Sequence, residues 1–123
     1  MKATGTILGC AIAVLAAFPV AAHHSFAMFD QTRQVTLTGT IKQFQWTNPH
    51  SFILVTITNP QGQAEEWAIE CAAPAVLTGL GWKPGSLKPG DKVTVIAHPL
   101  KSGALGGEVV SVNLPSGQML THR

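Results

Sequence analysis

Apolar and polar residues alternate along most of this chain with a period of two. Five segments show the alternation and are rich in Val, Ile, Thr and aromatic residues: 35–46, 51–58, 63–71, 91–98 and 108–114. Such alternation is typical of β-strands that bury one face, and branched and aromatic side chains favour strands. The pattern therefore predicts a mainly β protein of five strands, to which residues 118–123 can add a short sixth strand.

The first predicted strand changes phase near its middle. Ile41 has one parity, whereas Phe44 and Trp46 have the other, so the slip falls at residues 42–43, downstream of Gly39. One extra residue in a strand makes a β-bulge, which bends the strand and increases its twist. We therefore expect a strongly curved first strand, as closure of a small barrel requires.

The segment between the third and fourth predicted strands has a helical pattern. Pro74 stands where the first helical residue would be, and Gly81 stands just past the end, which predicts a short helix over residues 74–80. Five strands with one helix between the third and the fourth is the element order of an oligonucleotide/oligosaccharide-binding (OB) barrel. An open β-sandwich with an inserted helical turn is the alternative.

The OB order has a consequence for two histidines that are far apart in the sequence. In such a barrel the loops after strands one and four border the same ligand-binding face. Residues 46–50 form the first of these loops and residues 98–107 the second. We therefore expect His50 and His98 to lie near each other.

The first 22 residues have the composition of a cleavable export signal. Lys2 precedes an apolar run over residues 7–18, which is short for a membrane helix because that needs about 20 apolar residues. Pro19 ends the run, and Val-Ala-Ala at residues 20–22 is the small-residue pattern of a cleavage site. We predict a signal peptide over residues 1–22 and one OB-like domain over residues 23–123, periplasmic or secreted.

Charge and length limit what the remaining domain can do. The chain has eight Lys and Arg against six Asp and Glu, and loss of Lys2 leaves seven against six. The 123 residues less 22 leave 101, enough for one compact core and too few for two. Nucleic-acid binders usually carry a clustered basic face, so we expect no nucleic-acid partner, and no membrane contact after cleavage.

Few residues offer covalent chemistry. Cys10 would leave with the signal, so Cys71 has no intramolecular partner, and we expect it to be a small buried apolar residue. Glu66 and Glu70 share a strand face about 13 Å apart, too far for the close carboxylate pair of a retaining glycosidase, and we expect both to be solvated. No nucleophile elbow or phosphate-binding glycine motif occurs. A binding or accessory protein is therefore favoured over an enzyme.

Cleavage after Ala22 would create a possible copper chelate at His23. The free amine and the Nδ1 atom of an N-terminal histidine bind one metal ion together, and a third imidazole completes a three-nitrogen site that suits copper(II). His50 and His98 are the candidates for the third ligand, and His24 can bind through its own ring. The alternative is that the two histidines are only the polar start of a mature chain.

A cut one residue earlier would change the predicted ligands. Cleavage after Ala21 would place His24 third, where copper can be wrapped by the amine, two backbone amides and that imidazole. Met28 offers a soft thioether to copper(I), although we expect it to pack the N-terminal segment onto the barrel. Either cut therefore permits a copper-binding protein for delivery or sequestration.

A metal-free binding module is the second hypothesis. Trp46 borders the first loop and could stack on a ligand, whereas Trp67 and Trp82 have the strand-like or buried context of core residues. Together with the glycine-rich loop at residues 102–107, Trp46 would bind a peptide, a glycan or a partner protein. His50 would then cap its turn by hydrogen bonding rather than bind metal.

Four short motifs stand out along the chain: AHHSF at 22–26, FQWTNPHS at 44–51, EW at 66–67, and LKPGD at 87–91 followed by HP at 98–99. With these motifs the chain resembles a family of small exported bacterial proteins that is catalogued as a domain of unknown function. The resemblance covers nearly all of residues 23–123. It implies an exported, compact protein and says little about activity. It implies that His23, His24, Asn48, His50 and His98 belong to the family pattern, and it adds Asn48 to the ligand-binding candidates.

Overall fold

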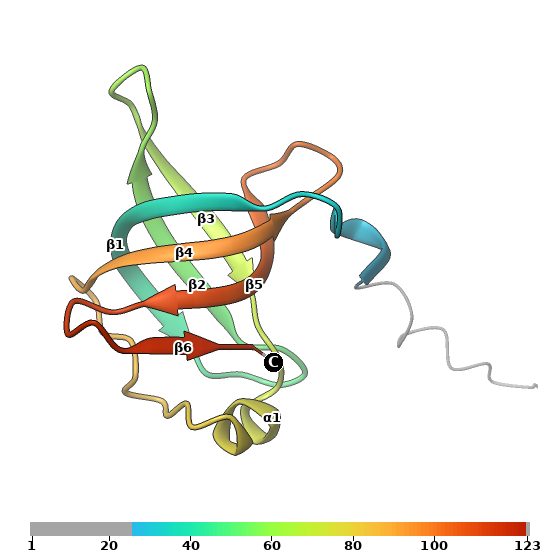
Figure 1. Ribbon diagram of the computed structural model, residues 1–123, viewed down its shortest axis with the longest axis vertical. Helices are drawn as coiled ribbons and strands as arrows, with labels where there is room; N and C mark the ends of the chain where they lie inside the picture. Colours follow the sequence, from blue (N-terminus) through green and yellow to red (C-terminus); the bar gives the residue numbers. More distant parts are fainter. Residues whose placement is uncertain (1–25, 123) are drawn as a thin grey trace, which may run out of the picture.

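Residues 26–122 are described by the computed structural model, and their strands follow one another in the predicted order (Figure 1). The strands are β1 (Val35–Gln45), β2 (Phe52–Thr58), β3 (Ala64–Glu70), β4 (Lys92–Pro99), β5 (Gly106–Asn113) and β6 (Met119–Thr121). A six-residue helix, α1 (Pro74–Gly79), lies between β3 and β4, and a 3-10 turn, η1 (Phe26–Met28), precedes β1. The prediction of a mainly β fold with one short helix after the third strand is confirmed.

The sheet closes on itself into a five-stranded barrel. Neighbouring strands follow the order β3-β2-β1-β4-β5, and β6 adds to β5 as an extra strand. A short parallel pairing between β3 and β5 closes the barrel, with Ala68 opposite Gly106 and Glu70 opposite Glu108. This closure confirms the OB-like barrel and excludes the open sandwich.

The first strand bends around the barrel at the predicted phase slip. The register between β1 and β2 shifts between Ile41 and Gln43, which leaves Lys42 as the extra residue of a bulge. Ile41 faces the core before the bulge and Phe44 packs against the core after it. The bulge therefore lets both halves of a long strand bury apolar side chains.

The inward-facing positions of the strands form the core: Leu37, Ile41, Ile53, Val55, Ile69, Val93, Val95, Ala97, Val109 and Val112. The buried side chains of Leu77 and Trp82 pack onto this core from α1 and the segment after it. The indole Nε1 of Trp82 donates a hydrogen bond to the carbonyl of Thr121 at 2.9 Å and so ties this segment to β6. No helix within residues 26–122 has the length and apolarity needed to cross a membrane.

The N-terminal segment lies along the loop of residues 100–105 that joins β4 to β5 (Figure 1). The backbone N–H of Lys101 donates to the Met28 carbonyl at 2.9 Å, and Phe29 forms a β-bridge with Leu100. Phe29 is 3% exposed, whereas Met28 is 48% exposed. The expectation that Met28 packs this segment onto the barrel was wrong, because the bridge turns the adjacent Phe29 inward instead.

Candidate functional site

Two of the four predicted copper ligands belong to the described part of the chain. His50 lies in the loop between β1 and β2, and His98 lies near the end of β4. The predicted signal peptide, His23 and His24 lie outside the described residues. His50 and His98 line two adjacent hollows that share Glu108 as a lining residue. The two histidines therefore line adjacent hollows, each its own, and the expected approach of their imidazoles stays a prediction.

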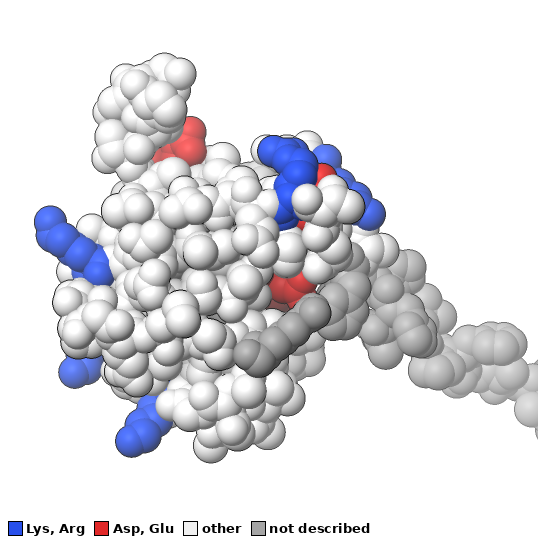
Figure 2. Space-filling view, viewed as in Figure 1, with Lys and Arg blue, Asp and Glu red and all other residues white. Residues whose placement is uncertain are grey.

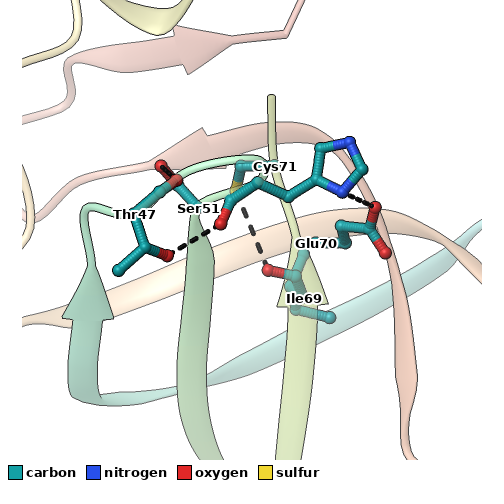
Figure 3. A network of polar contacts seen from close by, with 6 residues as sticks. Thr47, Ser51, Ile69, Glu70 and Cys71 are labelled. Atoms are coloured by element: carbon teal, nitrogen blue, oxygen red, sulfur yellow. Dashed lines mark hydrogen bonds and ion pairs between the residues drawn. The ribbon is translucent and has the colours of Figure 1, made fainter. Parts of the chain in front are cut away.

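The imidazole of His50 is held by Glu70, whose carboxylate is drawn with this contact as a dashed line in Figure 3. Its Nδ1 lies 2.8 Å from the Glu70 Oε1 atom, so Nδ1 carries the proton and donates a hydrogen bond to the carboxylate. The Thr47 hydroxyl donates to the His50 carbonyl at 2.7 Å and fixes the backbone of the loop. This orientation leaves Nε2 of His50 as the open ring nitrogen.

The imidazole of His98 is held in the same way by a backbone carbonyl. His98 faces outward on β4, opposite to the buried Val95 and Ala97. Its Nδ1 lies 2.7 Å from the Arg33 carbonyl oxygen, which can only accept, so Nδ1 donates. Engagement of one ring nitrogen by an oxygen acceptor is the arrangement that orients histidines for metal binding through the other.

Two carboxylates lie side by side at the β3–β5 seam. Glu108 is 6% exposed and accepts a hydrogen bond from Gln31 Nε2 at 2.7 Å. The side chain of Glu70 is 15% exposed. Burial raises the pKa of Glu70 above its ordinary value and outweighs the opposing effect of His50, while Glu108 raises that pKa further.

The two strand-face glutamates differ from the expectation that both are solvated. Glu66 is exposed and forms an ion pair with Lys42, which agrees with the expectation. Glu70 is largely buried, so that part of the expectation was wrong. The reason is that β5 joins β3 only beside residues 68–70 and covers that end of the strand.

Two neighbouring hollows flank this carboxylate pair. The acidic hollow, about 250 Å³, is lined by Phe29, Pro49, His50, Glu70, Val76 and Glu108 among others. The apolar hollow, about 310 Å³, is lined by Met28, Phe29, Phe52, Glu70, Leu105 and Gly106 among others. Phe29 and Glu70 line both. In Figure 2 the visible face is mostly uncharged, with Lys and Arg side chains at its periphery and acidic atoms in a recess.

The other two candidates for ligand binding lie in the loop after β1. Trp46 is half-buried and packs edge-on against Phe44, with ring centroids 5.6 Å apart. Asn48 is exposed and precedes Pro49 through a cis peptide bond. Neither lines the acidic or the apolar hollow, so their role in ligand binding stays a prediction.

The described residues do not form a complete metal site by themselves. Within residues 26–122, no group of three or more His, Cys, Asp or Glu side chains could hold a metal ion. Cys71 is buried, and burial raises the pKa of its thiol far above the usual range. A neutral thiol is a poor nucleophile and metal ligand, as expected for this cysteine. A metal ion here would need a ligand from outside residues 26–122.

The raised pKa of Glu70 leads to a test by pH. Between the ordinary carboxyl value of 4.5 and the raised value in the folded state, the folded protein binds more protons than the unfolded chain. Its free energy of unfolding therefore falls as pH rises through this window. Glu70→Gln should remove this fall in the free energy of unfolding. The free energy of unfolding of the variant, relative to that of the wild type, should therefore increase from pH 4 to pH 7 in urea unfolding experiments. Glu66→Gln is the exposed control, and a Glu70→Gln difference independent of pH would contradict the prediction.

The sequence and the fold were also compared with known proteins. A family model described as "Family of unknown function (DUF6152)" matches residues 11–109. No curated protein sequence matches the chain significantly. Among solved structures, the mitochondrial single-stranded DNA binding protein Rim1 of S. cerevisiae is similar, with a TM-score of 0.51 and 16% sequence identity over 68% of this chain and 93% of that chain. Identity this low shows a shared fold alone.

The similarity to Rim1 corrects the expectation of no nucleic-acid partner. A protein with this barrel fold is a single-stranded DNA binding protein, so nearly balanced charge was a wrong ground for excluding that class. Net charge governs long-range attraction, whereas single strands are also held by stacking of bases on aromatic side chains.

Proposed function

Because this chain belongs to the DUF6152 family of unknown function, its activity has to be inferred from its own residues, and we propose that it is an exported protein that binds copper through His23 with His50 or His98. Export rests on the predicted signal peptide over residues 1–22. The observation that carries the metal proposal is that His50 and His98 have the same hydrogen-bonding arrangement. Each donates from Nδ1 to an oxygen and leaves Nε2 open.

Oriented imidazoles favour metal binding because less freedom is lost when the metal arrives. The pairing of His50 with Glu70 is a carboxylate–histidine contact of the kind that fixes the tautomer and raises the basicity of a ligand. Glu70 and Glu108 also add negative charge beside the acidic hollow, which favours a cation over neutral ligands. A chain that presents one more chelating group here would complete a nitrogen-rich site.

The predicted mature N-terminus lies six residues before a residue that lines this hollow. Phe29 lines the acidic hollow together with His50. Six residue steps separate Phe29 from His23, a span of at most about 22 Å. An N-terminal His23 within this reach would supply its amine and Nδ1, and His50 or His98 would supply Nε2. Three nitrogens of this kind suit the tetragonal preference of copper(II).

The proposal predicts that copper affinity depends on the first residue. Mature protein that starts at His23 should bind copper(II) about 100-fold more tightly than the same chain with its N-terminal amine acetylated, since acetylation removes the amine nitrogen from the chelate. Competition with a chelator gives the affinities, and electron paramagnetic resonance should show nitrogen coupling. Affinity should fall below about pH 6, because protons compete for the nitrogens.

Variants of the described histidines identify the third ligand. His50→Ala or His98→Ala should weaken binding in the chain that starts at His23, and N-terminal sequencing of the exported protein gives the true cut. Copper binding that requires His24 but not His50 or His98 would favour cleavage after Ala21. Equal, weak binding by the His23 chain and its acetylated form would overturn the proposal.

A further inference from the structure

Large exposed apolar side chains line the apolar hollow. Met28 comes from η1 and Leu105 from the loop of residues 100–105, and they are 48% and 43% exposed. Phe52, on the outer face of β2, adds a half-buried aromatic ring to the lining. Single exposed apolar residues are common on protein surfaces, but several that converge on one hollow are typical of a binding site.

Two glycines keep the strands close together at the floor of this hollow. A Cβ atom at Gly106 would lie 2.8 Å from the Leu100 Cδ1 atom and 3.1 Å from the Ala68 carbonyl oxygen. A Cβ atom at Gly107 would lie 2.6 Å from the His98 carbonyl oxygen. The absence of side chains at these two positions therefore lets β5 approach its neighbours.

The charge beside the hollow is one-sided. Glu70 lines the apolar hollow, and its register partner Glu108 lies next to it in the acidic hollow. Among residues 26–122, no Lys or Arg lines either hollow. Glu70 is paired with His50 through Oε1, and a cationic group that enters the apolar hollow would add a second favourable contact to this carboxylate.

From these features we propose that the apolar hollow binds an extended segment of a partner protein that carries Arg or Lys next to a large apolar side chain. A volume of about 310 Å³ is at the lower limit for small-molecule pockets and suits one or two side chains. The apolar side chain lies between Met28 and Leu105. The stem of the Arg or Lys packs along Phe52, and its charged end reaches Glu70.

Single-stranded nucleic acid is the competing occupant because the similar solved structure is a DNA-binding protein. The surface between the loops of an OB barrel is also where oligonucleotides bind. Here, however, a phosphate near Glu70 and Glu108 would meet two carboxylates. Charge complementarity therefore favours a cationic peptide, and an oligonucleotide serves as the second probe.

The test uses a fluorescent, end-capped peptide with the core Leu-Arg-Leu and chelator-treated protein, so that the outcome is independent of copper. We expect saturable binding by fluorescence anisotropy. Replacement of the peptide's Arg by citrulline, which keeps the shape without the charge, should weaken binding about tenfold, as expected for loss of one charge-assisted contact. The same measurement uses a labelled oligothymidine as the alternative ligand.

Three variants separate binding from folding. Leu105→Ser changes an exposed residue, so it should keep the thermal midpoint and lose most of the peptide binding. Glu70→Gln should reduce the preference for Arg over citrulline. Glu66→Gln, on the same strand face but paired with Lys42, should bind like wild type. Binding of oligothymidine in place of the peptide, or peptide binding unaffected by Leu105→Ser, would overturn the proposal.

Discussion

Gly39→Ala is expected to lower the free energy of unfolding by about 3 kcal/mol, the upper end of the usual cost of overpacking. An added Cβ atom would lie 2.1 Å from the Thr56 carbonyl oxygen and 2.9 Å from the Ile57 Cγ2 atom. Gly39 pairs with Ile57 on β2 and with Val93 on β4, so it is held from both sides. The clash cannot be relieved by rotation of a side chain, because its nearest atom belongs to the backbone of a paired strand.

Urea unfolding of Gly39→Ala and a control variant measures this cost. Gly79, at the end of α1, has no heavy atom near the position of an added Cβ, and alanine is the better helix former. Gly79→Ala should therefore leave the unfolding midpoint unchanged or raise it slightly. Similar midpoints for both variants would show that β1 and β2 can separate without cost and would contradict the close approach at Gly39.

Trp82→Ala is expected to cost about 3–5 kcal/mol, the range for loss of a large buried aromatic side chain. Trp82 is 1% exposed, and its ring centroid lies 6.0 Å from that of Phe44. The substitution would leave a cavity and would also remove the hydrogen bond to the Thr121 carbonyl. We therefore expect both the core and the attachment of β6 to be weakened.

Two companion variants divide the effect of Trp82→Ala. Trp82→Phe keeps much of the volume but loses the indole N–H, and should cost about 1–3 kcal/mol for the carbonyl left without its partner. Trp46→Ala removes a half-buried indole and should cost less than Trp82→Ala. The free energies come from denaturant unfolding of each variant. A larger loss from Trp46→Ala would show that the loop after β1 contributes more to the core than the segment after α1, and would contradict the prediction.

Local patterns predicted the fold because each strand can be recognised from a few consecutive residues. Alternation marked the strands, and the change of parity after Ile41 marked the bulge that the register between β1 and β2 confirms. Pro74 and Gly81 marked the two ends of the helical segment. The order of these elements then predicted closure, although no local signal describes the parallel pairing of β3 with β5.

The candidate site was less predictable because it is assembled across that parallel pairing. Glu70 could be placed on a strand face, but its burial depends on β5. Glu108 was missed as a site residue, although an acidic residue directly after two glycines at the start of a strand was a signal. Phe29 was missed because its neighbour Met28 has the same apolar character, and only the bridge to Leu100 decides which of them is buried.

Chemical labelling of the buried Cys71 thiol can report local opening of the native protein. Its backbone N–H donates to the Ser51 carbonyl at 2.8 Å, and the Ser51 N–H donates to the Ala72 carbonyl at 3.2 Å, so the thiol lies behind the join between β3 and the loop that carries His50. Cys71 is 2% exposed, so separation of this join would increase the access of a thiol reagent to it. The rate of labelling in the native protein therefore reports how often the histidine-bearing loop leaves the barrel, and a ligand that bridges the two would slow it.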